Sequence, residues 1–171
     1  LDAYKSALAG DPVSAFGGII GITRCVDMDT AKAITETFFE IVAAPSYEEG
    51  VIEFFCEKKP NLLVLTITPG YSPKIQTTGN RCGFLVQEDM LPRLPEMKEG
   101  KWAGKERPDL WDDLIFAWKT AAITKSNAIV LVKDGAAVGI GGGFTNRVDA
   151  AEYALKLACE KAKGAVLASD A

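Results

Sequence analysis

The sequence of 171 residues predicts an α/β fold, and three observations lead to that prediction. Short apolar runs such as residues 16–23 and 128–132 have the length and composition of strands. Between such runs, apolar residues recur at helical spacing, as in residues 27–41 and 111–122. Strands and helices alternate in this way on both sides of a charged segment, which is the pattern of α/β proteins.

The first half of the chain predicts a strand, a helix and a second strand. Residues 16–23 form an apolar strand that is entered through glycines, and Asp27 or Asp29 caps the helix that follows. A brief strand at residues 41–44 ends at Pro45, because proline cannot extend a strand ladder. The helix between these strands is predicted to bury one face, formed by Ala31, Ile34, Phe38 and Ile41.

A second helix and two more strands follow. Ser46 and Glu49 have the spacing of a capping box, which predicts a helix behind Ser46 that carries Val51, Ile52, Phe54 and Phe55. Residues 62–68 contain β-branched side chains with little alternation, so they are predicted to form a buried strand. Residues 69–78 are predicted to be loop, and residues 82–87 another strand.

The best internal boundary lies at Pro92, Pro95 and the charged run 98–107, where turn residues are common and periodicity is poor. Beyond it, Asp134 and Gly135 predict a tight turn between strands at residues 128–132 and 136–140. The helix before these strands has a wide apolar stripe of Trp111, Leu114, Ile115, Trp118 and Ala122. The helix after them, residues 146–163, has a small-residue face of Ala151, Ala154, Leu155, Ala158 and Ala162, and a last strand follows at residues 165–168.

Composition excludes several classes of function. A net charge of −4 without a basic cluster argues against nucleic-acid and membrane-surface partners, and no apolar run is long enough to span a bilayer. The four cysteines lie far apart, which predicts reduced, buried thiols in the cytoplasm. The chain has no histidine, so serine and cysteine triads of the usual type are excluded and no metal site is expected.

The strongest candidate for chemistry is the segment from Lys125 to Arg147. Lys125, Ser126 and Asn127 lead into an apolar strand, and a glycine-rich run at residues 139–143 precedes Arg147 in the first turn of a helix. Helix-start amides, glycines that admit a ligand and one guanidinium predict a site for an anion or a carboxamide.

These motifs, in this order, resemble one family. Besides the Lys-Ser-Asn-Ala and glycine-rich runs, the chain contains ALAGDPVSAFGGII at residues 7–20, FEIVAAPSY at residues 39–47 and ASDA at residues 168–171. Together they are similar to the AICAR transformylase part of the bifunctional AICAR transformylase/IMP cyclohydrolase enzymes. The resemblance covers the chain nearly end to end, apart from a divergent middle at residues 68–106.

The resemblance implies a more specific fold than the pattern alone. It implies tandem cytidine-deaminase-like units, each a three-layer α/β/α sandwich without zinc, of which this chain would hold parts. Residues 1–95 would be the rear part of the first unit, residues 106–171 the front part of the second, and residues 96–105 the connecting loop. No internal repeat is visible in the sequence to support the duplication.

The resemblance also implies roles for individual residues. Asn127 and Lys125 would be catalytic, with Asn127 beside the substrate amine and the formyl group. The substrate-binding residues would be Gly17, Glu40, Asn127 and Arg147, and Val148 would contact the cofactor. From the residues alone, Asn127 is more simply a helix C-cap or a turn residue, Arg147 could be a solvated arginine at a helix start, and Gly17 could equally open a strand.

The implied activity is transfer of a formyl group from 10-formyltetrahydrofolate to the 5-amino group of AICAR. The implied partners are those two small molecules, a second copy of the chain in a homodimer with sites at its interface, and a fused IMP cyclohydrolase domain. Whether folate or formate is the donor stays open at this point. The chain departs from the family in its glycine loop, where Phe144 and Asn146 replace a glutamine and a serine.

Three functions compete. The family's Lys-His proton-transfer pair is expected upstream of Leu1, so the chain is expected to be an interior piece of the enzyme. The second possibility is a non-catalytic ligand-binding or dimerisation module derived from that family. The third, a dinucleotide-binding fold built on Gly139 and Gly141, is disfavoured because Phe144 occupies the position of the third glycine.

Overall fold

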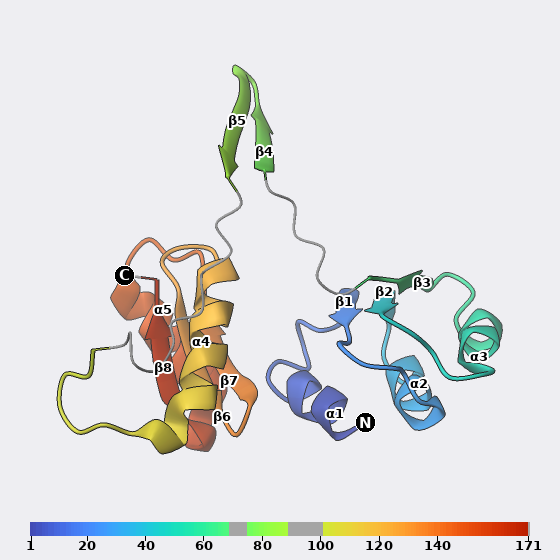
Figure 1. Ribbon diagram of the computed structural model, residues 1–171, viewed down its shortest axis with the longest axis horizontal. Helices are drawn as coiled ribbons and strands as arrows, with labels where there is room; N and C mark the ends of the chain where they lie inside the picture. The colour runs from blue at the N-terminus through green and yellow to red at the C-terminus, as the bar shows by residue number, and fades with distance from the viewer. Residues whose placement is uncertain (69–74, 89–100, 171) are drawn as a thin grey trace.

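A computed structural model describes residues 1–68, 75–88 and 101–170, which form two lobes and a two-stranded hairpin (Figure 1). Parallel strands with helices packed on them make up the first lobe, and an antiparallel sheet between helices makes up the second. The predicted α/β class is therefore confirmed. The cytidine-deaminase-like assignment stays a prediction.

The first lobe has two layers. Its sheet has the parallel order β1-β2-β3, and its helices lie together on one side of that sheet (Figure 1). The elements are α1 (Asp2–Leu8), β1 (Gly18–Gly21), α2 (Met28–Thr35), β2 (Phe39–Ala44), α3 (Val51–Lys58) and β3 (Leu63–Thr66). Val42 and Ala44 of β2 pack on Ile34 of α2 and Phe55 of α3, and all four are almost fully buried. The opposite face of the sheet exposes Ile19, Leu63 and Leu65.

Two helix predictions in this lobe need correction. Helix α2 is capped by Asp27, whose side chain accepts a 2.7 Å hydrogen bond from the Thr30 amide, but it ends at Thr35. Phe38 therefore lies beyond the helix and Ile41 belongs to β2, because residues 39–44 pair with β1 and β3 instead of continuing the helix.

The predicted capping box at Ser46 and Glu49 is wrong. The N-cap of α3 is Gly50, which has a φ of 82°, and no side chain forms a capping hydrogen bond there. Residues 46–48 instead pair with Val26, whose amide and carbonyl bond to Ser46 and Glu48. A bridge that joins two distant segments has replaced the local cap.

Strand β3 is an edge strand, so the prediction that residues 62–68 form a buried strand is correct for the strand and wrong for its burial.

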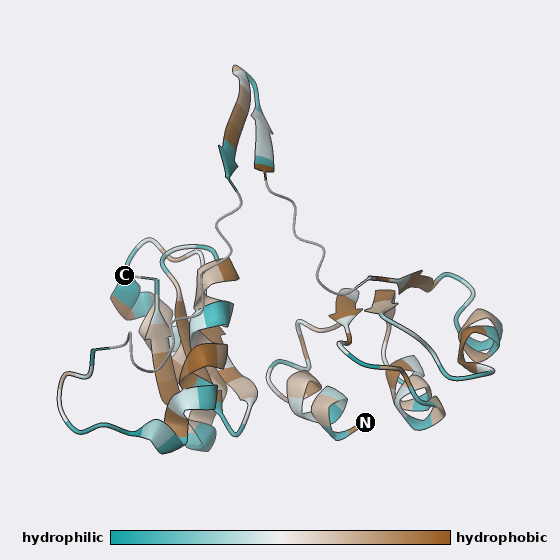
Figure 2. Cartoon of the chain, in the orientation of Figure 1, coloured by the Kyte–Doolittle hydropathy of each residue, from teal (hydrophilic) through white to brown (hydrophobic). Residues whose placement is uncertain are grey.

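The hairpin consists of β4 (Ile75–Asn80) and β5 (Gly83–Glu88), all of whose side chains are exposed. Four residues predicted as loop, 75–78, therefore belong to a strand, while residues 69–74 lie outside the described part of the chain. Figure 2 shows the apolar colour of β5, to which Phe84, Leu85 and Val86 contribute.

The second lobe has three layers. Its antiparallel sheet has the order β7-β6-β8, formed by β6 (Ile129–Lys133), β7 (Ala136–Gly141) and β8 (Val166–Ser169). Along β6, Ile129 and Leu131 pack on α5 (Arg147–Ala158), while Val130 and Val132 pack on α4 (Trp111–Ile123). Short 3-10 turns, η2 (Pro108–Leu110) and η3 (Cys159–Ala162), flank these elements. The period of two along β6 thus places one helix on each face of the sheet.

The predicted faces of the two helices are shifted. Helix α4 buries Ala117 and Ala121 rather than its tryptophans, and α5 ends at Ala158 rather than near residue 163. The buried face of α5 is Ala150, Ala154 and Ala158, and Leu155 is half exposed. Small residues occupy the contacts because both helices lie close to the sheet.

The predicted turn at Asp134 and Gly135 is confirmed. Both residues have positive φ, 52° and 73°, as a two-residue hairpin of this kind requires. Asp113, in the first turn of α4, accepts hydrogen bonds from the amides of Asp134 (3.0 Å) and Gly135 (2.7 Å). One carboxylate therefore ties the β6–β7 turn to α4.

We expect Asp113→Ala to lower the free energy of unfolding by about 1–3 kcal/mol, because two turn amides lose a charged acceptor. Urea unfolding at neutral pH measures the change. Asp112→Ala is the matched control: it removes a carboxylate from the same helix turn, and in the described residues that carboxylate makes no hydrogen bond to the turn. Equal losses of unfolding free energy in the two variants would contradict the conclusion that Asp113 ties the β6–β7 turn to α4.

Several sequence predictions fall partly outside the described residues. The proposed boundary at Pro92 and Pro95 and the first half of the run 96–105 lie there, so the division into two units stays a prediction. All four cysteines are free and exposed, so the prediction that they are buried is wrong. Among the described helices, none has both the length and the apolar character that crossing a membrane requires.

Candidate functional site

The candidate residues of the second lobe meet at one edge of its sheet. Ile129, at the start of β6, pairs with Gly141 at the end of β7 and with Ser169 at the end of β8. The antiparallel register therefore brings together three segments: residues 125–128, the loop 142–146 with the start of α5, and residues 169–170. No single stretch of the sequence contains this arrangement.

Asn127 is bonded to the glycine loop. Its backbone amide and its side-chain Nδ2 both donate to the carbonyl of Phe144, at 3.1 and 3.0 Å. The peptide bond that precedes Asn127 is cis. Asn127 is half-buried, and neither of these hydrogen bonds uses its side-chain carbonyl. Asn127 therefore fixes the loop and keeps one acceptor for a ligand.

Arg147 lies beside the end of β8. Its Nε donates to the Ser169 hydroxyl at 3.0 Å, and its Nη2 forms a 3.0 Å ion pair with Asp170. The arginine side chain remains 40% exposed, whereas that of Asp170 is 16% exposed. A cation in a first helical turn opposes the helix dipole, and the chain itself supplies an anion that offsets this.

Asp170 is held in its ionised form. The Ser126 hydroxyl, the Ala128 amide and the Arg147 guanidinium hold the pKa of its carboxyl far below its usual range. The Ser126 hydroxyl contributes most, and it bonds to Oδ2, while Ala128 and Arg147 bond to Oδ1.

This depressed pKa gives the stability of the lobe an acid dependence. Because the unfolded chain binds the proton more tightly than the folded one, the stabilisation is complete at neutral pH and is lost as the pH falls through and below the usual carboxyl range. We expect the urea midpoint of the wild type to fall more steeply than that of Asp170→Asn between about pH 5 and pH 2. Parallel acid profiles in the two proteins would contradict this.

Lys125 and Val148 lie at the margin of this group. Lys125 is past the end of α4 rather than in its last turn, and its carbonyl accepts a 2.6 Å hydrogen bond from the Gly143 amide. The Lys125 side chain is exposed, and its methylene stem runs near Gly143. Val148 follows Arg147 on α5 and is 66% exposed. Both side chains are therefore open to a ligand.

Gly17 and Glu40 lie in the first lobe. Gly17 has a φ of 74° and donates to the Phe38 carbonyl at 2.8 Å, which places it beside the start of β2. Glu40 is the extra residue of a bulge, since Gly18 pairs with Phe39 while Ile19 pairs with Ile41. Glu40 thus lies in strand β2, although the helical spacing of residues 27–41 had predicted it near the end of a helix. These two residues are near one another, but within the described residues no hydrogen bond or ion pair joins them to Asn127 or Arg147.

The glycines of β7 allow helix α5 to pack closely on the strand and do not open space for a ligand. A Cβ at Gly139 would collide with the Ala154 carbonyl, and one at Gly141 with the Ala150 carbonyl, both on α5. Gly142 packs against the Thr124 methyl group, and Gly143 has a φ of 75°. Phe144 turns inward and packs on Tyr153 of α5, with ring centroids 5.4 Å apart. The expectation that this run admits a ligand is therefore wrong for Gly139 and Gly141.

Three residues of the site were not among the predicted site residues: Ser126, Ser169 and Asp170. Ser126 is part of the Lys-Ser-Asn-Ala run and the other two belong to the ASDA run, so the motifs contain them. Their partners, however, lie between 22 and 44 residues away along the chain. The sequence carries no local signal for contacts at that separation.

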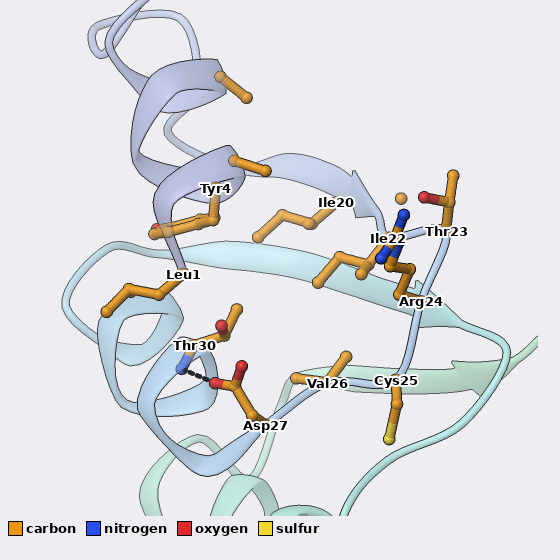
Figure 3. A pocket seen from close by; sticks show the side chains of 13 residues that line it. Leu1, Tyr4, Ile20, Ile22, Thr23, Arg24, Cys25, Val26, Asp27 and Thr30 are labelled. Carbon is orange, nitrogen blue, oxygen red and sulfur yellow. Dashed lines mark hydrogen bonds between the residues drawn. The ribbon is translucent and has the colours of Figure 1, made fainter.

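The cavities along α1 do not contain the predicted site residues. One of about 370 Å³ lies between α1 and the end of β1, where Figure 3 shows Tyr4, Ile20, Ile22 and Arg24 around it. Another, of about 340 Å³, lies between the end of α1 and the β6–β7 turn and is lined by Gly10, Lys133 and Lys161. Lys133 and Lys161 already donate to the carbonyls of Lys163 and Ala9. Within the described ranges, no three His, Cys, Asp or Glu side chains gather as metal ligands would.

Comparison with known proteins identifies relatives of the whole chain. The model of the family described as AICARFT/IMPCHase bienzyme matches residues 1–157. The bifunctional purine biosynthesis protein PurH of Thermoanaerobacter sp. (strain X514) is 46% identical over 172 residues, which cover 99% of this chain and 34% of that protein. The PurH proteins of Thermosynechococcus vestitus and Bacillus cereus (strain B4264) are 46% and 42% identical, over 33% and 34% of their lengths. The chain thus spans about a third of the curated relatives it matches.

Proposed function

The chain belongs to the AICARFT/IMPCHase bienzyme family, and from that premise we propose that it serves the formyl-transfer reaction rather than the cyclohydrolase reaction. The reaction moves the formyl group of 10-formyltetrahydrofolate onto the 5-amino group of AICAR and gives FAICAR. This step belongs to the biosynthesis of IMP and other purines, in which the named relatives act.

The observation that supports the proposal is the meeting of Asn127 and Arg147 at one edge of the β7-β6-β8 sheet. A carboxamide that keeps an acceptor and a half-exposed guanidinium suit a ligand that carries both an amide and an anionic group. AICAR is such a ligand, since it has a carboxamide and a phosphate.

The reaction needs orientation and electrostatic stabilisation. The amine of AICAR is a poor nucleophile because its lone pair is delocalised into the imidazole-carboxamide, so the two reactants must be held in attacking geometry. Asn127 would orient the amine and stabilise the oxyanion of the tetrahedral intermediate, and Arg147 would hold the substrate. Lys125, exposed beside the same loop, would add positive charge.

The remaining predicted residues have supporting roles. Val148, exposed next to Arg147, would contact the folate through its apolar side chain. Gly17 and Glu40 would contact AICAR from the first lobe or from the first lobe of a second copy. The histidine of the family's Lys-His proton-transfer pair would come from outside these residues, because they contain no histidine.

We further propose that the protein forms a homodimer in the cytoplasm and is fused to an IMP cyclohydrolase domain. The outer face of the β1-β2-β3 sheet exposes apolar side chains such as Ile19 and Leu63, at 69% and 59%, which favours coverage by other protein. Phe16, also 69% exposed, extends this apolar area next to Gly17.

A formyl-transfer assay on the full-length protein that carries this chain tests the proposal. We expect turnover of AICAR with 10-formyltetrahydrofolate, with formate and ATP as the comparison donor. Binding of AICAR without turnover would favour the alternative of a non-catalytic module, and absence of both would reject the assignment.

A further inference from the structure

Asp170 is the point at which the segments of the candidate site are joined. Its Oδ2 accepts from the Ser126 hydroxyl, and its Oδ1 accepts from the Ala128 amide at 3.1 Å and from Arg147 at 3.0 Å. Its own amide donates to the Ala128 carbonyl at 3.4 Å. One carboxylate thus links the start of β6, the end of β8 and the start of α5.

The contacts of Asp170 surround Asn127 along the chain. Ser126 precedes Asn127 and Ala128 follows it, and the carboxylate of Asp170 is bonded to both. Asn127 itself bonds to Phe144, on the loop that leads into α5. The position of the Asn127 carboxamide therefore depends on Asp170 although the two side chains share no hydrogen bond among the described residues.

Arg147 is held by neighbouring residues of β8. Asp170 bonds to Nη2 and Ser169 to Nε, so the plane of the guanidinium is fixed at two of its nitrogens. A guanidinium held in this way presents its remaining N–H groups in one direction. Because the Asp170 side chain is 16% exposed and that of Arg147 is 40% exposed, a ligand would meet the arginine.

We propose that Asp170 is a positioning residue, which holds Asn127 and Arg147 in a common geometry through Ser126, Ala128 and Ser169. The inference rests on the proposed function, since it gives Asp170 a part in the same site. An ion pair with a half-exposed arginine contributes little to stability by itself. Besides the acid-dependent stabilisation described above, this carboxylate therefore acts through the geometry that it imposes on two other side chains.

Two serine variants separate the positioning of Arg147 from the positioning of Asn127. In the full-length protein, Ser169→Ala frees Nε of Arg147 and is expected to raise the KM for AICAR with kcat nearly unchanged. Ser126→Ala releases the segment before Asn127 and is expected to lower kcat with KM nearly unchanged. Asp170→Asn should do both and reduce kcat/KM by about tenfold to a hundredfold, the effect of a misplaced catalytic group.

A double variant tests whether Asp170 acts through Arg147. If it does, adding Asp170→Asn to Arg147→Ala should raise the KM for AICAR no further, because the contact is already lost. A purely structural role would lower the amount of folded enzyme and leave both constants of the remaining enzyme unchanged. Wild-type kcat and KM in Asp170→Asn, or multiplied effects on KM in the double variant, would overturn the proposal.

Amide hydrogen exchange tests the positioning role of Asp170 independently of the proposed reaction. In Asp170→Asn, residues 126–130 and 142–148 should exchange at least about tenfold faster, while β1 and β2 remain protected. This comparison does not depend on formyl transfer. If wild-type protein shows no turnover, the proposed function fails, and local exchange still decides whether Asp170 holds these segments. Unchanged exchange there would overturn the positioning role whatever the reaction.

Discussion

We expect Gly141→Ala to lower the free energy of unfolding by about 3 kcal/mol and to weaken the packing of α5 on the sheet. A Cβ at this position would overlap the backbone carbonyl of Ala150, which is part of a helix and cannot rotate away as a side chain can. Ala150 and Ala154 are fully buried against β7, so α5 would have to move away from the strand. Urea unfolding, followed by the circular dichroism of the helices, measures the loss.

The control for Gly141→Ala is Gly21→Ala. Gly21 ends strand β1, and a Cβ there meets no atom within 4 Å. Its substitution should change stability by less than about 1 kcal/mol, in either direction. If Gly141→Ala changed the free energy of unfolding as little as Gly21→Ala, that result would contradict the close packing of α5 on β7.

The second large effect concerns turnover. In the full-length protein we expect Asn127→Ala to lower kcat by about a hundredfold or more, the scale on which loss of an oxyanion donor acts. The fold of the loop should survive this change, because the backbone amide of residue 127 still donates to the Phe144 carbonyl. Steady-state kinetics with both substrates saturating measure the effect.

Asn146→Ala is the matched control for Asn127→Ala. Asn146 ends the loop 142–146, to which Asn127 is bonded, and caps α5 by accepting a 2.8 Å hydrogen bond from the Asp149 amide. Its removal should cost about 1 kcal/mol of stability with kcat little changed. Unchanged turnover in Asn127→Ala, together with a loss of stability like that of Asn146→Ala, would assign Asn127 a structural role only.

Local sequence signals predicted those features of the chain that depend on nearby residues. The helix cap at Asp27, predicted there or at Asp29, the Asp134-Gly135 turn and the strand at residues 128–132 each arise from backbone and side-chain preferences within a few residues. The same reasoning gave the wrong capping box at Ser46, because pairing of residues 46–48 with Val26 competes with a local cap. It also predicted a buried strand at residues 62–68, since periodicity cannot tell an edge strand from a central one.

The sequence by itself determined the α/β class, the family and the residue types of the candidate site. The tertiary structure alone decided which of those residues meet. It joined Arg147 to Asp170, 23 residues away, and assigned Gly139 and Gly141 to the packing of α5. The physical reason is that strand register and helix approach depend on contacts between distant segments. A sequence motif gives the residue types alone. That Asp170 is the carboxylate paired with Arg147 follows only from the packing of β6, β8 and α5.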